Sequence, residues 1–304
     1  MDLQTLLNDR RAGELALRIS RLLPKRLGYG LADLLGSFIT SRRQTPMARA
    51  IRTNQWVLHQ GKIASSQLDQ ITRQVWRNTA RAFYDMFRHV GHPDELLEMV
   101  IVPSELERII RLSQEKKQGI VITGVHLSWF DLAMAATGYR GLRGTALGLP
   151  QTTEAMDWQH AMRRQTGINV VPATMPNLRL AIRKLEEGEA LLTGVDRPMG
   201  GEAKHLPRFC GRPAHLPVHY VQIALRAKAP VIIFAPIMRP DGHCHIMASD
   251  FIEMQPHPDR EVEIIQNAER VLEIAADFIR QAPEQWSIFY PVWPDAIAET
   301  PEAS

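Results

Sequence analysis

The sequence predicts an α/β protein of three layers, in which a mostly parallel central sheet is flanked by helices. Short runs rich in β-branched residues alternate along the chain with longer segments in which apolar residues recur at helical spacing. Such alternation is typical of parallel strands that are connected by helices. The chain has 304 residues, of which 45% are hydrophobic and 23% charged, so it contains enough apolar side chains for a large core.

The order of the predicted elements supports this fold class. One apolar face continues through residues 46–90, which predicts helical structure there. A helix is expected after Pro103-Ser104 and another after Asp131, and the remaining helices are expected at residues 154–165, 177–187, the second half of 213–227, and 259–281. Strands are expected at residues 99–102, 120–123, 145–149, 168–171, 190–194, 231–237 and 243–248.

The first 45 residues contain two apolar stripes among basic residues. One stripe consists of Leu3, Leu6, Leu7, Leu15, Ile19, Leu22 and Leu23, and the other, with the spacing of an amphipathic helix, of Leu27, Leu31, Leu34, Leu35 and Phe38. The basic residues are Arg10, Arg11, Arg18, Arg21, Lys25, Arg26, Arg42 and Arg43. Such helices can lie in a membrane interface, with leucines among acyl chains and arginines on anionic headgroups. A helical pair packed on the rest of the protein is the alternative. We divide the chain into amphipathic, basic helices (1–45), a single α/β domain (46–295) and a tail (296–304) that we expect to be frayed.

Composition excludes several other classes of protein. The net charge of +3 is small, and no long basic run is present, so nucleic acid is not an expected partner. Two cysteines do not make a disulfide framework and favour free thiols in a reducing compartment. The chain begins without the pattern of a signal peptide, and it lacks the run of about 18 apolar residues that a transmembrane helix needs.

Residues 119–131 are the stretch most indicative of chemistry. A buried strand is expected to end at Gly124, His126 follows it directly, and Asp131 precedes a helix. Open α/β sheets place their reactive groups in such loops, where a histidine and a carboxylate can act as general base and orienting group. His89 with Asp94 and His245 with Asp250 have the same spacing, but neither histidine follows a strand that leads into a helix. A purely structural histidine at a strand end is the alternative.

Polar residues near other predicted strand ends are candidates to assist His126. Arg163 and Arg164 precede the strand at 168–171, and Asp196 and Arg197 follow the strand at 190–194. An arginine there could hold a phosphate or carbonyl oxygen by charge-assisted hydrogen bonds. The alternatives are cations placed at a helix C-terminus for the two arginines and a turn-forming residue for Asp196.

Two further considerations bear on the reaction. His205, Cys210, His215, His219 and residues 243–245 include the ligand types that zinc prefers, but they lack the spacing of a metal site, so no metal is predicted. The sequence also lacks a serine nucleophile elbow, a dinucleotide fingerprint and a phosphate loop. A His–Asp pair without a protein nucleophile suggests direct acyl transfer, in which His126 deprotonates an acceptor hydroxyl, Asp131 orients the imidazole, and the hydroxyl attacks a thioester.

These residues carry a resemblance to a known family. The segment from His126 to Asp131 resembles the His-x4-Asp/Glu motif of the glycerolipid acyltransferase superfamily. Within it, the chain resembles the bacterial lipid A biosynthesis (lauroyl/myristoyl) acyltransferase family, which includes the phosphatidylinositol mannoside acyltransferases. The matching blocks are Leu23-Pro24 with residues 31–36, Arg164 with Gly167 and residues 170–172, residues 195–197 with 209–214, and residues 283–286. The resemblance covers residues 15–293. The chain departs from it in having Asp131 where the lipid A branch usually has glutamate, Ser128-Trp129-Phe130 in place of small residues, and Phe209-Cys210-Gly211 in place of Phe-Phe-Gly.

The resemblance implies a monotopic enzyme on the cytoplasmic face of the bacterial inner membrane. Its donor would be an acyl-CoA or an acyl-carrier-protein thioester, its acceptor a hydroxyl of a membrane glycolipid or lysophospholipid, and it would bind no metal or other cofactor. His126 and Asp131 are the expected catalytic residues, and the expected substrate-binding residues are Ser128, Arg164, Asp196 and Arg197. A catalytically silent lipid-binding relative and a metal-dependent hydrolase are the alternatives.

Overall fold

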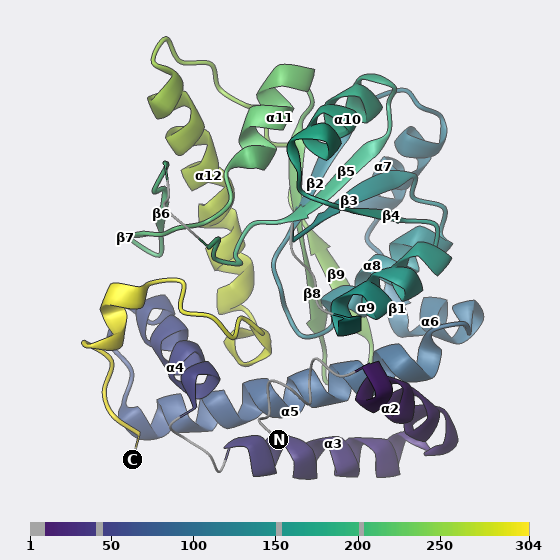
Figure 1. Cartoon of the computed structure of the whole chain (residues 1–304), viewed down its shortest axis with the longest axis vertical. Helices are drawn as coiled ribbons and strands as arrows, with labels where there is room; N and C mark the ends of the chain where they lie inside the picture. The colour runs from purple at the N-terminus through teal and green to yellow at the C-terminus, as the bar shows by residue number, and fades with distance from the viewer. Residues whose placement is uncertain (1–9, 41–44, 150–153, 201–203, 304) are drawn as a thin grey trace.

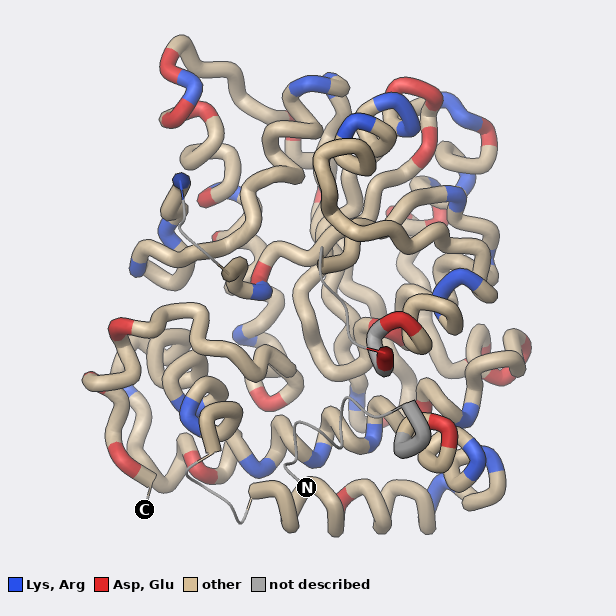
Figure 2. Tube along the Cα trace, in the orientation of Figure 1, with Lys and Arg blue, Asp and Glu red and all other residues tan. Residues whose placement is uncertain are grey.

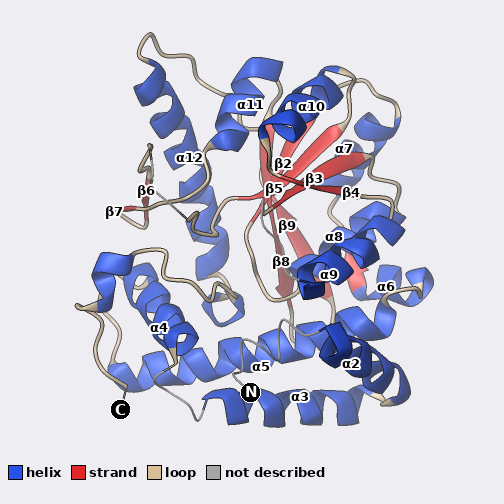
Figure 3. Cartoon of the chain, viewed as in Figure 1, coloured by secondary structure: helices blue, strands red, loops and turns tan. Residues whose placement is uncertain are grey.

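The structure, a computed structural model, describes residues 10–40, 45–149, 154–200 and 204–303. It confirms the α/β class, since helices lie on both sides of a seven-stranded sheet (Figures 1 and 3). In the described part of the chain, no helix is both long enough and apolar enough to cross a bilayer. Some residues of the predicted N-terminal surface lie outside the described ranges, namely Leu3, Leu6, Leu7, Arg42 and Arg43.

The central sheet is mostly parallel, as predicted. Its strands lie in the order β1 (Val100–Ile101), β9 (Cys244–Ala248), β8 (Val231–Met238), β2 (Ile120–Gly124), β5 (Ala190–Gly194), β3 (Gly144–Gly148) and β4 (Asn169–Pro172). The five strands from β8 to β4 are parallel, while β9 runs antiparallel to β8 and pairs with β1 in parallel. The carboxyl ends of β2 and β5, which are neighbours, therefore meet at one edge of the sheet.

Side chains of the strands supply two separate cores, one on each face of the sheet. Successive residues of β2 point in opposite directions, so Val121 lies in one core and Ile120 and Ile122 in the other. The first core is covered by α10 (Met175–Glu186), α11 (His219–Ala227) and α12 (Arg260–Arg280). The second is covered by α6 (Pro93–Met99), α7 (Ser104–Gln114), α8 (Phe130–Tyr139) and α9 (Glu154–Gln165). This alternation makes the three layers.

The apolar face predicted for residues 46–90 divides into two helices. These are α4 (Pro46–Leu58) and α5 (Ser65–His89), and the chain turns between them at Gln60 and Gly61, which both have positive φ. The long helix α5 extends under the sheet and carries α2 (Arg10–Leu22) and α3 (Lys25–Thr40), with α3 lying along it at the edge of the molecule (Figure 1).

Helix α3 packs on α5 through its small residues rather than through its leucines. Its buried residues are Gly28, Ala32, Gly36 and Thr40, one in every turn. A Cβ at Gly28 would overlap the ring of Tyr84, and one at Gly36 would lie 3.0 Å from the backbone of Arg77, so glycine permits this close approach. The leucine stripe lies on the other face, where Leu34 is 71% and Phe38 61% exposed.

The C-terminal third of the chain departs from the predicted elements at two places. The second half of residues 213–227 is helical from His219 as expected, but it is preceded by a small hairpin of β6 (Arg208–Phe209) and β7 (Arg212–Pro213). Two short 3-10 helices, η1 (Pro283–Gln285) and η2 (Pro294–Ile297), lead into the tail. The tail is not frayed, because the guanidinium of Arg52 donates hydrogen bonds to the carbonyls of Pro301 and Glu302.

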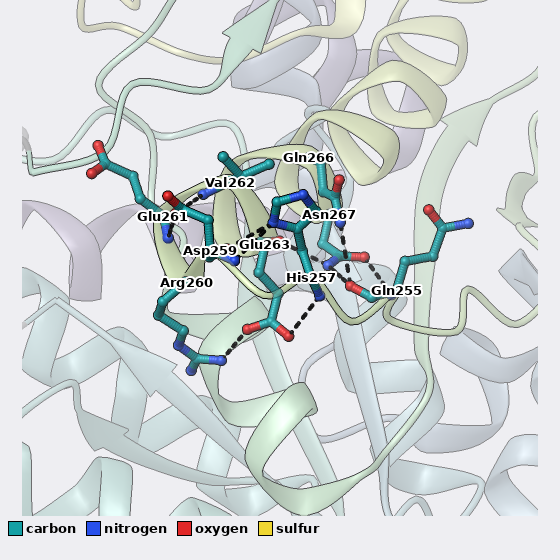
Figure 4. A network of polar contacts seen from close by, with 9 residues as sticks. All are labelled: Gln255, His257, Asp259, Arg260, Glu261, Val262, Glu263, Gln266 and Asn267. Atoms are coloured by element: carbon teal, nitrogen blue, oxygen red, sulfur yellow. Dashed lines mark hydrogen bonds and ion pairs between the residues drawn. The ribbon is translucent and has the colours of Figure 1, made fainter.

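Helix α12 begins at a well-defined cap. The carboxylate of Asp259 accepts hydrogen bonds from the backbone amides of Glu261 and Val262, as expected for an N-cap aspartate (Figure 4). About two turns further, the buried side chain of Asn267 both accepts a hydrogen bond from Gln255 N and donates one to Gln255 O. The loop before the helix is thereby held against it, which closes the first core beside β8.

Candidate active site

His126 and Asp196 occupy equivalent positions on the two central strands. Gly124, the last residue of β2, is paired in register with Gly194, the last residue of β5, and each functional residue follows its glycine by two positions. A side chain at position 194 would overlap the imidazole of His126, so glycine there leaves the space that the ring occupies. The register of two parallel strands thus places the histidine beside the carboxylate.

The carboxylate of Asp196 is fully buried and accepts three hydrogen bonds. Its Oδ1 lies 2.6 Å from Nδ1 of His126, and its Oδ2 accepts the backbone N–H of His126 at 2.9 Å and the indole N–H of Trp286 at 2.8 Å. Three donors therefore satisfy the hydrogen-bonding capacity of this buried side chain, as is usual for buried polar groups. Asp196 therefore holds both the ring and the backbone of His126.

This arrangement determines how the imidazole can react. An ionised carboxylate accepts hydrogen bonds but cannot donate them. In a neutral His126, the nitrogen that faces Asp196 therefore carries the proton, and this nitrogen is Nδ1. Nε2 is left as the basic nitrogen, and it makes no hydrogen bond to any residue that the structure describes. The side chain is 29% exposed, and its ring stacks on Phe130 with the two centroids 5.1 Å apart. A fixed imidazole with a free Nε2 is suited to act as a general base.

Asp131 has a different partner from the one predicted. The sequence suggested that it orients His126, but its Oδ1 accepts hydrogen bonds from Nε and Nη2 of Arg163 at 2.9 and 2.5 Å. The reason is that Asp131 lies in the first turn of α8, which packs beside α9, whereas the imidazole nitrogen points to the end of β5. Asp131 therefore does not make the orienting contact that was predicted for it, and in this structure Asp196 makes that contact.

The segment after His126 is clamped by residues near the C-terminus. Leu127 forms a β-bridge with Trp286, and the amide of Ser287 donates to the carbonyl of His126 at 2.9 Å. The hydroxyl of Ser128, predicted to bind substrate, lies 3.0 Å from the carbonyl of Gln285 and 2.7 Å from the hydroxyl of Ser287. Within the structure Ser128 thus holds the loop, and a contact with substrate stays a prediction.

The two other predicted binding residues, both arginines, are placed differently from each other. Arg197 follows Asp196 directly, and its guanidinium lies over the ring of Tyr290, 5.2 Å from the centroid. Its N–H groups have no acceptor among the described residues, so they are free to bind an anion or a carbonyl. Arg164 is exposed and donates to the carbonyl of Val170 at 3.4 Å, while its neighbour Arg163 is the one that reaches Asp131.

The histidines considered as metal ligands do not gather in the described ranges. His219 lies against Thr193, with Nε2 3.2 Å from Oγ1, and burial lowers its pKa to about 4. His243 and His245 face Asp241 at a surface turn, with N–O distances of 3.7 and 2.8 Å. Across the residues that the structure describes, no group of three or more His, Cys, Asp and Glu side chains could hold a metal ion.

Asp196 was predicted to assist His126 by binding substrate, but its buried carboxylate contacts the imidazole instead, and Trp286 was not predicted to contact Asp196. The sequence contains a signal for the contact with the imidazole, because Thr-Gly-Val directly precedes both His126, at 123–125, and Asp196, at 193–195. Two buried strands that end in the same three residues can be expected to pair in register and present the next residues together. For Trp286 the only signal was its place in the C-terminal segment at 283–286.

Comparison with known proteins identifies the family of the chain. The sequence profile of the family described as bacterial lipid A biosynthesis acyltransferase matches residues 9–294, which is nearly the whole chain. None of the curated proteins matches the chain significantly. A match of this extent includes both central strands, the clamp at 285–287 and the helices α2 and α3. The chain therefore belongs to the family of bacterial lipid A biosynthesis acyltransferases, enzymes that transfer an acyl chain to a hydroxyl of a lipid.

Proposed function

We propose that His126, oriented by Asp196, is the general base of this acyl transfer and that an acyl thioester is the donor. The observation that carries the proposal is the 2.6 Å contact between Nδ1 of His126 and the buried carboxylate, which leaves Nε2 free to take a proton. The absence of a serine elbow from the sequence supports direct transfer without an acyl-enzyme.

In the proposed reaction, His126 carries a proton from the acceptor hydroxyl to the leaving thiolate. Nε2 of His126 removes the proton of the acceptor hydroxyl as its oxygen attacks the thioester carbonyl. Asp196 stabilises the imidazolium that forms, because the positive charge lies beside its buried carboxylate. When the tetrahedral intermediate collapses, the carbon–sulfur bond breaks and the imidazolium returns its proton to the leaving thiolate. An ester and a free thiol are the products.

Arg197 is our candidate for contact with the donor or acceptor. It is the residue after Asp196, it is half-buried, and its donors have no acceptor within the described ranges. A planar guanidinium held on an aromatic ring keeps its N–H edge available for a phosphate or carbonyl oxygen. In this proposal Asp131 has an indirect role, since its ion pair fixes Arg163 where α8 meets α9.

We further propose that the leucine face of α3 binds the membrane. Leu27, Leu31, Leu34, Leu35 and Phe38 are all exposed on one side of a helix whose other side is already packed on α5. In Figure 2 the trace of α3 is drawn almost entirely in tan, while blue basic segments lie on the neighbouring α2. Apolar side chains bordered by Arg18, Arg21, Lys25 and Arg26 match an anionic bilayer surface. This surface supports the membrane interpretation over a helical pair packed by its leucines.

The remaining parts of the proposal concern the setting of the reaction. We place the protein on the cytoplasmic face of the inner membrane, with a membrane glycolipid or lysophospholipid as acceptor. The donor is acyl-carrier protein or coenzyme A carrying the chain as a thioester, and no metal or bound cofactor takes part.

The test is product analysis of membranes incubated with a labelled acyl thioester. Acyl-CoA and acyl-carrier protein are supplied in separate reactions to wild type, His126→Ala and His245→Ala. His245 is a matched control because it also has an aspartate five positions later but lies on β9 beside Asp241. We expect wild type and His245→Ala to form the same acylated lipid, and His126→Ala to be slower by about 10²–10⁴-fold.

The other possible outcomes of this experiment would contradict the proposal. Equal transfer by His126→Ala and wild type would contradict the proposed base. No transfer by any of the three proteins, together with binding to lipid vesicles, would favour the catalytically silent lipid-binding relative.

A further inference from the structure

Asp85 is a fully buried carboxyl that connects two distant parts of the molecule. It lies on α5, and its Oδ2 accepts hydrogen bonds from the phenol of Tyr29 and from the indole of Trp129, both at 2.7 Å. Tyr29 belongs to α3, and Trp129 lies in the loop between His126 and Asp131. A single carboxyl oxygen thus joins the exposed N-terminal helix to the loop of the candidate active site.

Keeping a carboxyl in this position is costly to the fold. Its Oδ1 has no hydrogen-bond partner within the described ranges. Burial raises the pKa of the Asp85 carboxyl, and its two hydrogen bonds offset this only in part. A buried polar atom without a partner usually costs stability, and an apolar side chain would avoid that cost. The stability of the fold alone therefore does not explain why an aspartate occupies this position.

At the candidate active site, Trp129 is linked to the imidazole of His126 through the next residue of the loop, Phe130. Trp129 is buried, and the next residue, Phe130, stacks on His126 with centroids 5.1 Å apart and on Phe234 with centroids 5.5 Å apart. The amide of Phe130 donates to the carbonyl of Leu127, so this part of the loop is a tight turn. Because Phe130 directly follows Trp129 in this turn, a shift of the Trp129 side chain would move the ring against which His126 rests.

On the other side, Tyr29 is held firmly within α3. Two cations lie over its ring, with Lys25 Nζ 5.4 Å and Arg81 Cζ 4.9 Å from the centroid. It also meets the ring of Tyr84 edge to face at 5.8 Å. The opposite face of the same helix bears the exposed leucines. Any change in the seating of α3 on α5 therefore reaches the phenol that donates to Asp85.

We propose that Asp85 is a positioning residue that couples the seating of α3 on α5 to the orientation of His126. The helix that we assign to the membrane and the loop that carries the base then behave as one unit, and loosening of α3 lowers the rate of transfer. This inference rests on the proposed function, because it concerns the reaction assigned to His126.

The experiment compares two variants that each remove one donor to Asp85 with matched controls. Tyr29→Phe and Trp129→Phe delete the phenol hydroxyl and the indole N–H while retaining an aromatic ring. Tyr84→Phe deletes a hydroxyl at the same helical interface, where it donates to Leu23 O at 2.7 Å, and Trp76→Phe replaces a buried indole whose N–H has no partner among the described residues. Neither control side chain contacts the loop by any described hydrogen bond.

We expect kcat to fall roughly tenfold in Tyr29→Phe and Trp129→Phe with the KM for the thioester unchanged, since each loses one hydrogen bond to a carboxyl. Tyr84→Phe and Trp76→Phe should stay within about twofold of wild type. A merely structural role for Asp85 would lower the thermal midpoint of Tyr29→Phe and Trp129→Phe and leave kcat of the folded proteins unchanged, which would overturn the inference.

Hydrogen exchange of the amides of residues 126–131 supplies a readout that does not depend on activity. Exchange in this segment should be about tenfold faster in Tyr29→Phe than in wild type, and unchanged in Tyr84→Phe. Equal exchange in Tyr29→Phe and Tyr84→Phe would refute the coupling. If the wild type transfers no acyl chain, the proposed function fails, while the exchange data still decide whether α3 and the loop are coupled.

Discussion

Nδ1 of His126 lies 2.6 Å from Oδ1 of Asp196, although the two residues are 70 positions apart in the chain. The contact depends on the pairing of Gly124 with Gly194 at the ends of neighbouring parallel strands. It makes Asp196 the residue whose loss should most affect the orientation of the imidazole.

Asp196→Asn should lower kcat by about 10²–10⁴-fold with little change in KM, because the amide cannot stabilise an imidazolium or set the tautomer. Asp131→Asn should have a smaller effect, because its carboxylate binds Arg163 and not the imidazole. Steady-state kinetics of the two variants with one thioester donor provides the comparison. A larger loss in Asp131→Asn would show that the structure assigns the orienting role to the wrong carboxylate.

Trp286→Phe should lower kcat by roughly tenfold, since it removes one of the three donors to Asp196 and keeps an aromatic ring in the core. Trp293→Phe is the matched control, because its indole is also buried and packs on Phe209, yet its N–H has no partner in the described structure. Kinetics of both variants at one temperature tests this. Similar activity in the two variants would rule out a part for the indole N–H of Trp286.

Gly28→Ala should destabilise the protein by about 1–3 kcal/mol, because the added methyl group would overlap the ring of Tyr84 and push α3 away from α5. Gly30→Ala, on the same helix, meets nothing within 4 Å and should stabilise the protein by about 0.5–1 kcal/mol through higher helix propensity. Urea unfolding measures both. The packing of α3 would be in doubt if Gly28→Ala unfolded at the same urea concentration as wild type.

Leu34→Glu and Phe38→Glu should each reduce binding to anionic phospholipid vesicles by at least roughly tenfold, because a carboxylate costs free energy in the interface and repels the headgroups. Val262→Glu is the control, since Val262 is 42% exposed but lies at the start of α12 and away from α3. Vesicle sedimentation supplies the measurement. Undiminished binding by the α3 variants would mean that another surface meets the lipid.

The free energy of unfolding should fall as the pH is lowered from 7 to 5, in part because of His219. Burial lowers its pKa to about 4 in the folded protein, whereas an unfolded histidine has a pKa of about 6.5. Between these values the unfolded chain binds a proton that the folded chain does not, so acid favours unfolding. The contribution at pH 5 is about 2 kcal/mol.

Denaturant unfolding of wild type and His219→Gln at both pH values isolates this effect, because other titrating groups are common to the two proteins. The wild type should lose about 2 kcal/mol more than the variant on going to pH 5. An equal loss in both proteins would mean that His219 can be protonated in the folded state.

The sequence pattern predicts the structure best where neighbouring residues control it. The boundaries predicted for residues 154–165 and 190–194 coincide with α9 and β5, because helical spacing and β-branched runs both act over a few neighbouring residues. The pattern did not predict the strands at residues 208–213, which form a hairpin around Cys210 and Gly211, both with positive φ. A two-residue strand carries too little pattern to be recognised.

Three consecutive residues at which the chain departs from the pattern that it resembles make contacts that only the structure explains. Ser128 is bound by the clamp at 285–287, Trp129 donates to Asp85, and Phe130 supports the ring of His126. None of these partners lies within 30 positions of the loop except His126 itself, so no local signal could assign them.

The sequence by itself determined the α/β class, the strand that leads to His126 and the leucine stripe of residues 27–38. The tertiary structure alone decided which carboxylate orients the histidine, because strand register, not spacing along the chain, brings Asp196 to Nδ1. It also decided which face of α3 is buried. Leucines and small residues recur at the same helical period, and the close approach to α5 leaves room only for Gly28, Ala32, Gly36 and Thr40, so the leucines remain outside.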